Sequence, residues 1–91
     1  MDLKYVFLKK KPSLILITLK DETNNWYPSK IAAYCGASYV HVTKFIDELK
    51  KIELVLVEKK GKQKIVKLTD KGKALAGLIE EIIKRLEQKN S

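Results

Sequence analysis

Cys35 and His41, the one cysteine and the one histidine among 91 residues, are the side chains best suited to nucleophilic or metal chemistry. A catalytic thiolate needs a base within hydrogen-bonding distance, and six residues across a predicted turn place this pair poorly. A tetrahedral zinc ion would need several carboxylates beside these two ligands, and the sequence contains no such cluster. We predict no metal site. Cys35 is predicted to be a core thiol, with redox sensing as the alternative.

Other patterns typical of catalysis are also missing from the sequence. Acidic residues are adjacent only at 21–22, 47–48 and 80–81, which is typical of surface charge. The four glycines are scattered at 36, 61, 72 and 77, so they form no glycine-rich phosphate loop. We therefore predict that the chain is not an enzyme and requires no cofactor.

The chemistry that the sequence favours is binding of a polyanion by a lysine-rich turn. Residues 58–68 read EKKGKQKIVKL, with short β-type runs on both sides of Gly61. This pattern predicts a hairpin whose tip carries cations, and a solvated tip is the alternative. The predicted contact residues are the polar side chains around the turn, Lys59, Lys60, Lys62, Gln63 and Lys64.

The positive charge is concentrated in two parts of the chain, which has a formal net charge of +8. Residues 1–20 contain five lysines and one acid, and residues 55–73 contain seven lysines and two acids. Arg85 is the single arginine among 19 basic residues. Lysine is a point charge suited to phosphates, whereas arginine is the usual bidentate reader of guanine. The composition therefore indicates binding dominated by the nucleic-acid backbone, or else a lysine-rich, thermophile-like proteome.

The location expected from the sequence is the cytoplasm, in association with the nucleoid. A lone cysteine cannot form an intramolecular disulfide and gives no sign of secretion. The longest apolar run is LILI at 14–17, far too short to span a membrane, and no signal peptide is recognisable.

The elements expected to position these residues form one domain over residues 1–91. We predict a helical core at 12–52, a β-hairpin at 54–68 and a long helix at 70–88, capped by Thr69 or Asp70. Residues 1–11 fit a helix or a strand equally well. The first predicted helix, from Pro12 to about Asp21, has an apolar run that would also suit a strand.

Within the core, residues 29–52 have the spacing of a helix-turn-helix. One helix runs from Pro28-Ser29 through Tyr34, with Ser29 as its predicted N-cap. Gly36 is expected in the left-handed conformation that ends this helix, and Ser38 is expected to cap the next one. The inward-facing residues have helical spacing and are Ile31, Ala32, Cys35, Val42, Phe45, Ile46 and Leu49.

The stretch IAAYCGASYVHVTKFIDELKKIELV, followed by KKGKQK and LTDKG, resembles winged helix-turn-helix transcription regulators of the MarR, PadR and ArsR type. The resemblance covers residues 12–88 and is greatest to small archaeal or viral members. It implies an α+β fold in which the third helix enters the DNA major groove. It also implies that the hairpin, called the wing in this family, contacts the flanking DNA.

The predicted DNA-reading residues lie on the outward face of the third helix, near its N-terminus. They are Ser38, Tyr39, Val40, His41, Thr43 and Lys44. Val40 and the Thr43 methyl could meet a thymine methyl, whereas Lys44 suits a guanine or a phosphate. Asp47 shares this face and is expected at the edge of the groove because phosphates repel it. An ordinary solvated helix face is the alternative.

The last helix is predicted to form a dimer. Its apolar stripe includes a coiled-coil-like subset at 75, 79, 82 and 86. The proposed interface comprises Leu75, Leu78, Ile79, Ile82, Ile83 and Leu86. Packing of this stripe onto the first helix of the same chain is the alternative. Lys71 and Lys73 oppose the dipole at the start of the helix, which suggests phosphates nearby.

Together these patterns predict a homodimeric, sequence-selective double-stranded DNA-binding protein that regulates transcription. They indicate neither a membrane association nor a small-molecule ligand. Two alternatives share the same features: a sequence-neutral architectural DNA-binding protein, and a winged-helix module that binds another protein.

Overall fold

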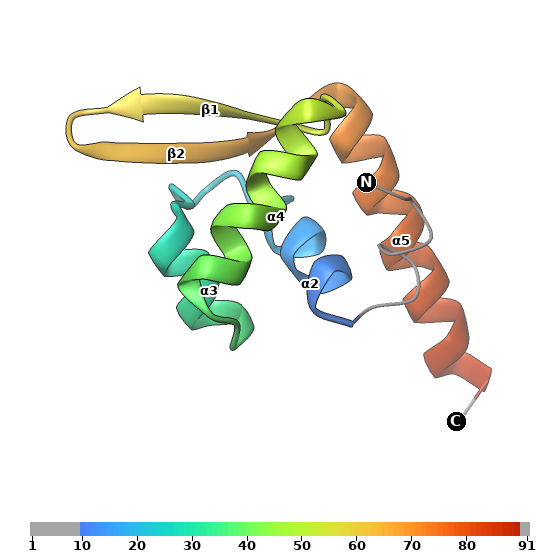
Figure 1. The fold of residues 1–91 in the computed structure, drawn as a ribbon. Helices are drawn as coiled ribbons and strands as arrows, with labels where there is room; N and C mark the ends of the chain where they lie inside the picture. The colour runs from blue at the N-terminus through green and yellow to red at the C-terminus, as the bar shows by residue number, and fades with distance from the viewer. Residues whose placement is uncertain (1–9, 90–91) are drawn as a thin grey trace.

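The computed structural model describes residues 10–89 and has the predicted α+β architecture (Figure 1). Three helices come first, an antiparallel pair of strands follows, and a long helix ends the described chain, which is the order expected for a helical core, a hairpin and a final helix. The elements are α2 (Lys10–Thr18), α3 (Pro28–Cys35), α4 (Tyr39–Lys51), β1 (Val55–Lys60), β2 (Gln63–Leu68) and α5 (Asp70–Lys89). The ambiguity over residues 1–11 lies almost entirely outside the described residues.

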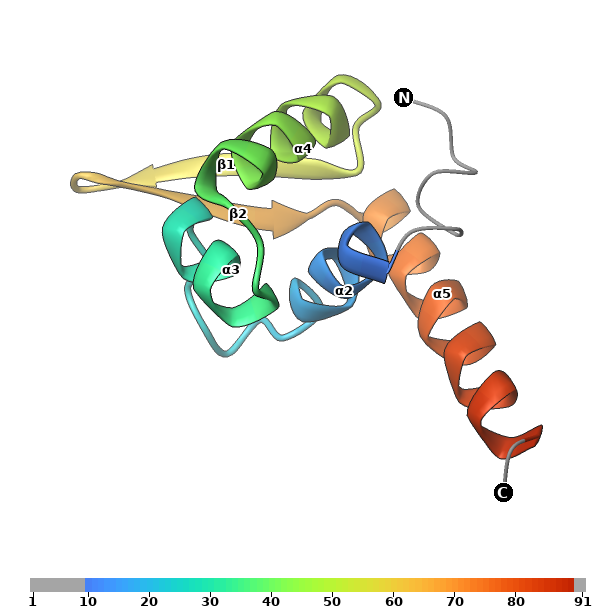
Figure 2. The same cartoon turned by 60° about the horizontal axis from the view of Figure 1, so that its bottom comes forward.

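The apolar run at 14–17 belongs to a helix, α2, and not to a strand. Ile15 and Leu16 are completely buried, because α2 lies between the α3–α4 pair and α5 (Figure 2). The helix ends at Thr18, earlier than predicted. There the Lys20 and Asp21 N–H groups donate to the Ile17 and Thr18 carbonyls, each at 3.1 Å, and so form a tighter turn.

Helix α3 begins one residue before its predicted cap. Pro28 occupies the first turn, and Tyr27 is the N-cap residue without a side-chain hydrogen bond. The prediction of Ser29 as N-cap was therefore wrong: a proline needs no N–H partner and can start the helix itself. Gly36 ends the helix with φ 64°, as predicted for a left-handed C-cap. The Lys11 ammonium donates to the Gly36 carbonyl, so a cation lies at this C-terminus.

Helix α4 confirms the prediction for the second half of the helix-turn-helix. The Ser38 hydroxyl accepts a hydrogen bond from the His41 N–H at 3.1 Å and so caps the helix. Its inward face is buried at Val42, Phe45, Ile46 and Leu49, as the helical spacing predicted. In the following turn Glu53 has φ 60°, a left-handed conformation that no glycine marks at this position.

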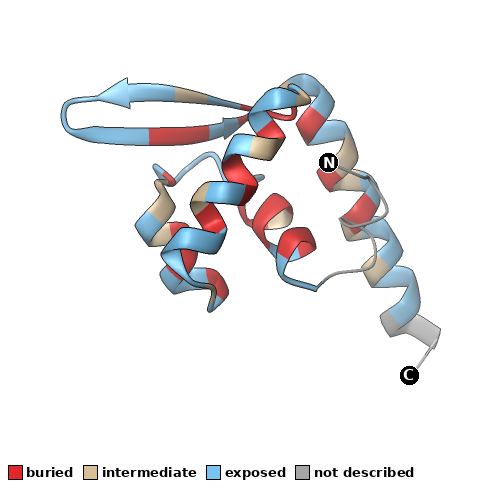
Figure 3. Cartoon of the chain, viewed as in Figure 1, coloured by how far each residue is buried: buried red, intermediate tan, exposed pale blue. Residues whose placement is uncertain are grey.

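The hairpin is covered on one side as far as Ile65 and Val66 of β2, which are buried, whereas its outer end is exposed (Figure 3). Val55 and Leu68 pair in the innermost rung, and the next residues that contact the core are Val57 and Val66. The outermost rungs, Lys59–Lys64 and Lys60–Gln63, consist of exposed residues. This part of the hairpin therefore extends from the body as an uncovered ribbon (Figure 1).

The LTDKG motif joins the hairpin to α5 through a single residue, Thr69. The Thr69 hydroxyl accepts from the Gly72 N–H at 3.1 Å and donates to the Glu53 carbonyl at 2.6 Å. A Cβ on Gly72 would lie 2.0 Å from the Leu54 carbonyl oxygen, so this position permits the closest approach of α5 to the hairpin base. Thr69 is thus the N-cap that the sequence left undecided between Thr69 and Asp70.

Candidate nucleic-acid interface

The outward face of α4 presents the residues predicted to read DNA. Val40 is 65% exposed and Tyr39 is 57% exposed, values that are high for large apolar or aromatic side chains. His41 and Lys44 are also exposed. Thr43 is half-buried, and its hydroxyl donates to the Val40 carbonyl at 2.9 Å. Its methyl group therefore remains the part available to a ligand.

A concavity of about 240 Å³ lies between α4 and the hairpin. Tyr39, Thr43, Asp47 and Lys50 line it from α4, and Lys64 lines it from β2. The structure thus brings the predicted helix face beside one of the predicted hairpin lysines. Of the other predicted hairpin residues, Lys59 is exposed directly opposite Lys64, and Lys60, Lys62 and Gln63 are exposed farther towards the tip.

The described lysines divide into those with and those without an intramolecular partner. Six have a carboxylate or a backbone carbonyl as partner: Lys11, Lys20, Lys51, Lys67, Lys71 and Lys73. A seventh, Lys30, donates to the Asn24 side-chain oxygen at 3.4 Å. Within residues 10–86, the lysines on the α4 face and the outer hairpin have no hydrogen bond or ion pair; they are Lys44, Lys50, Lys59, Lys60, Lys62 and Lys64. Lys10 and Lys84 also have none there. The unneutralised charge is therefore concentrated where α4 and the hairpin meet solvent.

One cross-strand pair of lysines destabilises the hairpin of the isolated protein by electrostatic repulsion. Lys59 and Lys64 are directly opposite in the antiparallel register, so their side chains share one face of the hairpin. Like charges at such positions repel and destabilise the pair. Glu58, by contrast, is neutralised by Lys67 at 3.4 Å nearer the base. An anion bound at the outer rungs would relieve the repulsion between the two lysines.

Lys71 and Lys73, the cations in the first turn of α5 that suggested nearby phosphates, make contacts within the chain instead. Lys71 donates to the Ile52 carbonyl at 3.2 Å, at the C-terminal end of α4, where a cation is favourable. Lys73 pairs with Glu22 at 2.7 Å, and this hydrogen bond and charge raise the pKa of Lys73 and lower that of Glu22. Both lysines therefore have structural partners that the sequence did not reveal.

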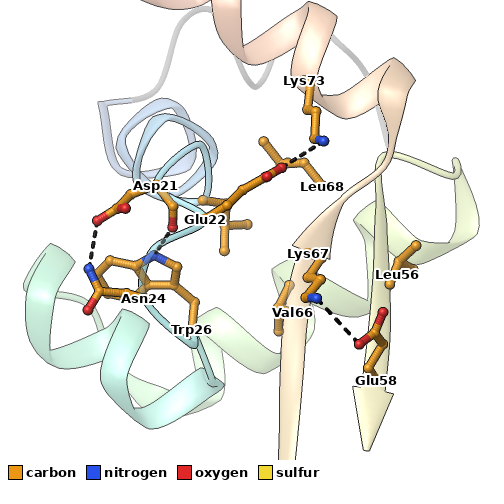
Figure 4. Close-up of a pocket in the computed structure, with 11 residues that line it drawn as sticks. Asp21, Glu22, Asn24, Trp26, Leu56, Glu58, Val66, Lys67, Leu68 and Lys73 are labelled. Atoms are coloured by element: carbon orange, nitrogen blue, oxygen red, sulfur yellow. Dashed lines mark hydrogen bonds and ion pairs between the residues drawn. The ribbon is translucent and has the colours of Figure 1, made fainter.

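Behind the hairpin, the loop at 21–26 fixes the base of β2 (Figure 4). The Val66 N–H donates to the Trp26 carbonyl at 2.7 Å, and the Trp26 indole donates to the Asp21 carbonyl at 3.0 Å. Hydrogen bonds from Thr23 and Asn24 lower the pKa of Asp21 and order the turn. A second concavity of about 290 Å³ lies here, between this loop, the hairpin and the start of α5. The Glu22–Lys73 and Glu58–Lys67 pairs line it.

Comparison with known proteins decides the family. No family model matches the sequence. An uncharacterised protein of Archaeoglobus fulgidus is 33% identical over 85 residues, which cover 90% of each chain. A crystal structure of a protein from the same organism is 32% identical and has a TM-score of 0.79 over 92% of this chain and 97% of that one. The chain belongs to the same family as this archaeal protein. Its own α3–α4 pair and hairpin have the winged helix-turn-helix arrangement.

Other solved structures share the winged-helix fold. Sso10a-2, a DNA-binding protein from Sulfolobus solfataricus, is 26% identical, with a TM-score of 0.69 over 88% of this chain and 84% of that one. MepR, a transcription regulator of the Staphylococcus aureus multidrug efflux pump MepA, is 17% identical, with a TM-score of 0.81 over 96% of this chain and 66% of that one. The hairpin β1–β2 is accordingly the wing, and α4 occupies the place of the third helix in the predicted arrangement.

The apolar stripe of α5 is divided between the core and the surface, which corrects part of the predicted dimer interface. Ile79 is 2% exposed and packs in the core with α2, and Leu75 and Ile83 are packed against the same core. These three residues thus follow the alternative of packing within the chain. Leu78, Ile82 and Leu86 are exposed, at 56%, 45% and 57%. These three outer residues are the part of the stripe that is most available to a partner.

Cys35 and His41, the residues considered for catalysis, lie in different environments: one is in the core and the other is on the surface. Cys35 is buried, with its sulfur 3.6 Å from the Thr18 hydroxyl, as expected of a core thiol. His41 is exposed on α4. No group of His, Cys, Asp and Glu that could hold a metal ion occurs among the described residues, and none of their helices is long and apolar enough to cross a membrane.

Proposed function

We propose that this winged-helix protein binds double-stranded DNA as a homodimer and regulates transcription. In this proposal α4 enters the major groove with Tyr39, Val40, His41, Thr43 and Lys44, while Ser38 and the wing contact phosphates. The observation that carries it is the concentration of unpaired lysines on α4 and the outer wing. Lysines elsewhere are largely neutralised by the chain's own carboxylates and carbonyls.

The proposal is supported by DNA binding in two proteins of similar structure. MepR has been crystallised in complex with DNA, and Sso10a-2 is a DNA-binding protein. Sso10a-2 resembles this chain over most of its own length, so its activity is a guide to the winged-helix body and not only to a fragment of it. A DNA-bound role would also place the protein at the nucleoid in the cytoplasm.

The proposed dimer rests on the outer stripe of α5. Leu78, Ile82 and Leu86 succeed each other every four residues and form one exposed apolar line. A two-fold axis beside Ile82 would place Leu78 against Leu86 of the partner subunit, which makes the line self-complementary. Such a dimer would present two α4 helices to successive major grooves, about 34 Å apart.

A mobility-shift titration across salt concentrations tests DNA binding. If the four exposed lysines of the outer wing, Lys59, Lys60, Lys62 and Lys64, displace counterions from about four phosphates, the logarithm of the association constant should fall with log salt with a slope of roughly −4 per protomer. A shift that is absent at low salt, or insensitive to salt, would refute the proposal. Recovery of a protein partner under those conditions would favour the protein-interaction alternative.

A sequence-neutral architectural DNA-binding protein is the second candidate. It is favoured by the near absence of arginine, because base recognition by bidentate side chains would usually employ it. Selection from a pool of random duplexes separates the two candidates. Enrichment of a defined two-part site supports the regulator, whereas undiminished binding without enrichment supports the architectural protein.

A further inference from the structure

Asp47 is an acidic residue on an otherwise cationic surface. It is exposed on α4 and borders the concavity that Lys50 and Lys64 also line. The other acid of α4, Glu48, is half-buried and pairs with Lys51 at 3.6 Å. A carboxylate at the site of DNA contact lowers affinity for every phosphate nearby, so its presence there calls for a compensating contact.

Asp47 makes no hydrogen bond or ion pair with the side chains described in residues 10–86, although it shares a surface with unpaired lysines. The acids elsewhere in the fold are largely engaged: Glu22 by Lys73, Glu58 by Lys67, and Glu80 by Lys20. Both oxygens of the Asp47 carboxylate are therefore available to donors outside the chain.

The position of Asp47 on the helix determines which donors it could meet. Val40, Lys44 and Asp47 follow one another at i, i+4 and i+7, so they form a single ridge. That ridge is opposite the buried face made by Val42, Ile46 and Leu49. A helix with side chains is about 10–12 Å across and fills a major groove about 12 Å wide. The ridge farthest from the core then points to the base edges, while the flanks of the helix face the phosphates.

This geometry differs from the earlier expectation that Asp47 lies at the edge of the groove. An ionised carboxylate only accepts hydrogen bonds, so on the groove floor it requires an exocyclic amine. Cytosine presents its N4 amine there without an adjacent acceptor, whereas the adenine amine stands beside the acceptor N7, which repels a carboxylate. We infer that Asp47 is a specificity-determining residue that accepts a hydrogen bond from a cytosine N4 amine in the major groove. The inference rests on the proposed function and names one base that the site reads.

The test is selection from a random duplex pool with the full chain and three variants. Wild type should enrich a cytosine at one fixed position of each half-site, by roughly fivefold or more over other bases. Asp47→Asn should shift that position to adenine, because an amide pairs with adenine N6 and N7. Asp47→Ala should lose the preference there and keep the others. Glu53→Gln is the matched control, since it removes one negative charge from an exposed residue outside the α4 helix.

The outcomes distinguish this inference from the function on which it depends. If both Asp47 variants bind every duplex more tightly and keep the wild-type base preferences, the carboxylate only repels phosphates and the inference is wrong. If wild type binds with a steep salt dependence but enriches no sequence, base reading by Asp47 is refuted while DNA binding stands. If wild type binds no duplex at low salt, the proposed function fails as well.

Discussion

Individual lysines on the two arms of the interface should differ in what they contribute. Lys44 belongs to the ridge of α4 that points away from the core, whereas Lys60 lies in the outermost rung of the wing. A base contact matters only for the right sequence, but a phosphate contact matters for all sequences. The two residues therefore allow affinity and specificity to be measured separately.

We expect Lys60→Ala to weaken binding to preferred and random duplexes by the same factor and to reduce the salt slope by about one. Lys44→Ala should weaken binding to the preferred duplex more than to the random one. Titrations of both variants against both duplexes at several salt concentrations make the comparison. Equal losses for Lys44→Ala on the two duplexes would contradict its assignment as a base-reading residue.

At the level of single residues, exposure was predictable and partners were not. The helical period placed Val40 and Lys44 outside and Val42 and Leu49 inside, and the structure agrees. Nothing in the local sequence could show that Lys73 meets Glu22, because their contact depends on how a distant loop packs beside α5. The roles of Lys71 and Lys73 were misread for this reason.

Among the elements, the junction between wing and α5 depends on a close backbone approach. Gly72→Ala would place its Cβ 2.0 Å from the Leu54 carbonyl oxygen, and this backbone atom cannot rotate away. We expect a loss of about 1–3 kcal/mol in the free energy of unfolding, as for other overpacked sites. Chemical denaturation of the variant measures it.

Gly77 offers a matched control in the same helix. A Cβ there meets nothing within 4 Å, so Gly77→Ala should gain about 0.5–1 kcal/mol from helix propensity. Equal effects of the two substitutions would show that the close approach at Gly72 is absent in solution.

The contact between the end of α2 and α5 should make stability depend on pH. Lys20 and Glu80 are 2.7 Å apart, and the hydrogen bond and charge of Lys20 lower the pKa of Glu80 from its ordinary value of 4.5. A lowered folded-state pKa gives stability that is present above the unfolded pKa and lost as the pH falls below it.

Melting temperatures measured from about pH 6 down to pH 3 should therefore fall less steeply for Glu80→Gln than for wild type. Glu81→Gln serves as the control, because Glu81 pairs with Arg85 inside α5 and joins no two elements. An unchanged slope for Glu80→Gln would show that this ion pair does not contribute in solution.

The elements that could be predicted from the sequence are those with local signals, whereas their packing partners could not be predicted. Helix α4 and the hairpin have strong periodic and turn signals, and both were located within two residues. Helix α5 was also located correctly, but its apolar stripe is wide enough for two surfaces. Periodicity cannot tell a core face from a partner face, so it did not show that Ile79 is buried in the core or that Leu75 and Ile83 also pack against it.

For the whole molecule, the oligomeric state decides how much DNA one particle can engage. Ile82→Glu would place a charge at the centre of the exposed stripe and should convert the proposed dimer to monomers. Light scattering over a range of concentrations would measure this. Affinity for a two-part DNA site should fall much further than affinity for an isolated half-site. The reason is that the two protomers would then bind their half-sites separately and no longer as one linked particle.

Lys84→Glu provides the comparison, because it introduces the same side chain on the opposite, polar face of α5. It should remain dimeric. A wild-type chain that stays monomeric at high concentration would contradict the proposed interface, and so would an Ile82→Glu variant that remains dimeric.

The uncovered outer rungs of the wing have an evolutionary consequence. Lys59, Lys60 and Gln63 contribute nothing to the buried core, so they can be exchanged without a folding penalty. Each lysine gained or lost there should change the strength of DNA attachment by a similar step. In the proposed DNA complex, substitutions confined to the tip would therefore change the overall strength of attachment, while the contacts made by the α4 face would stay the same.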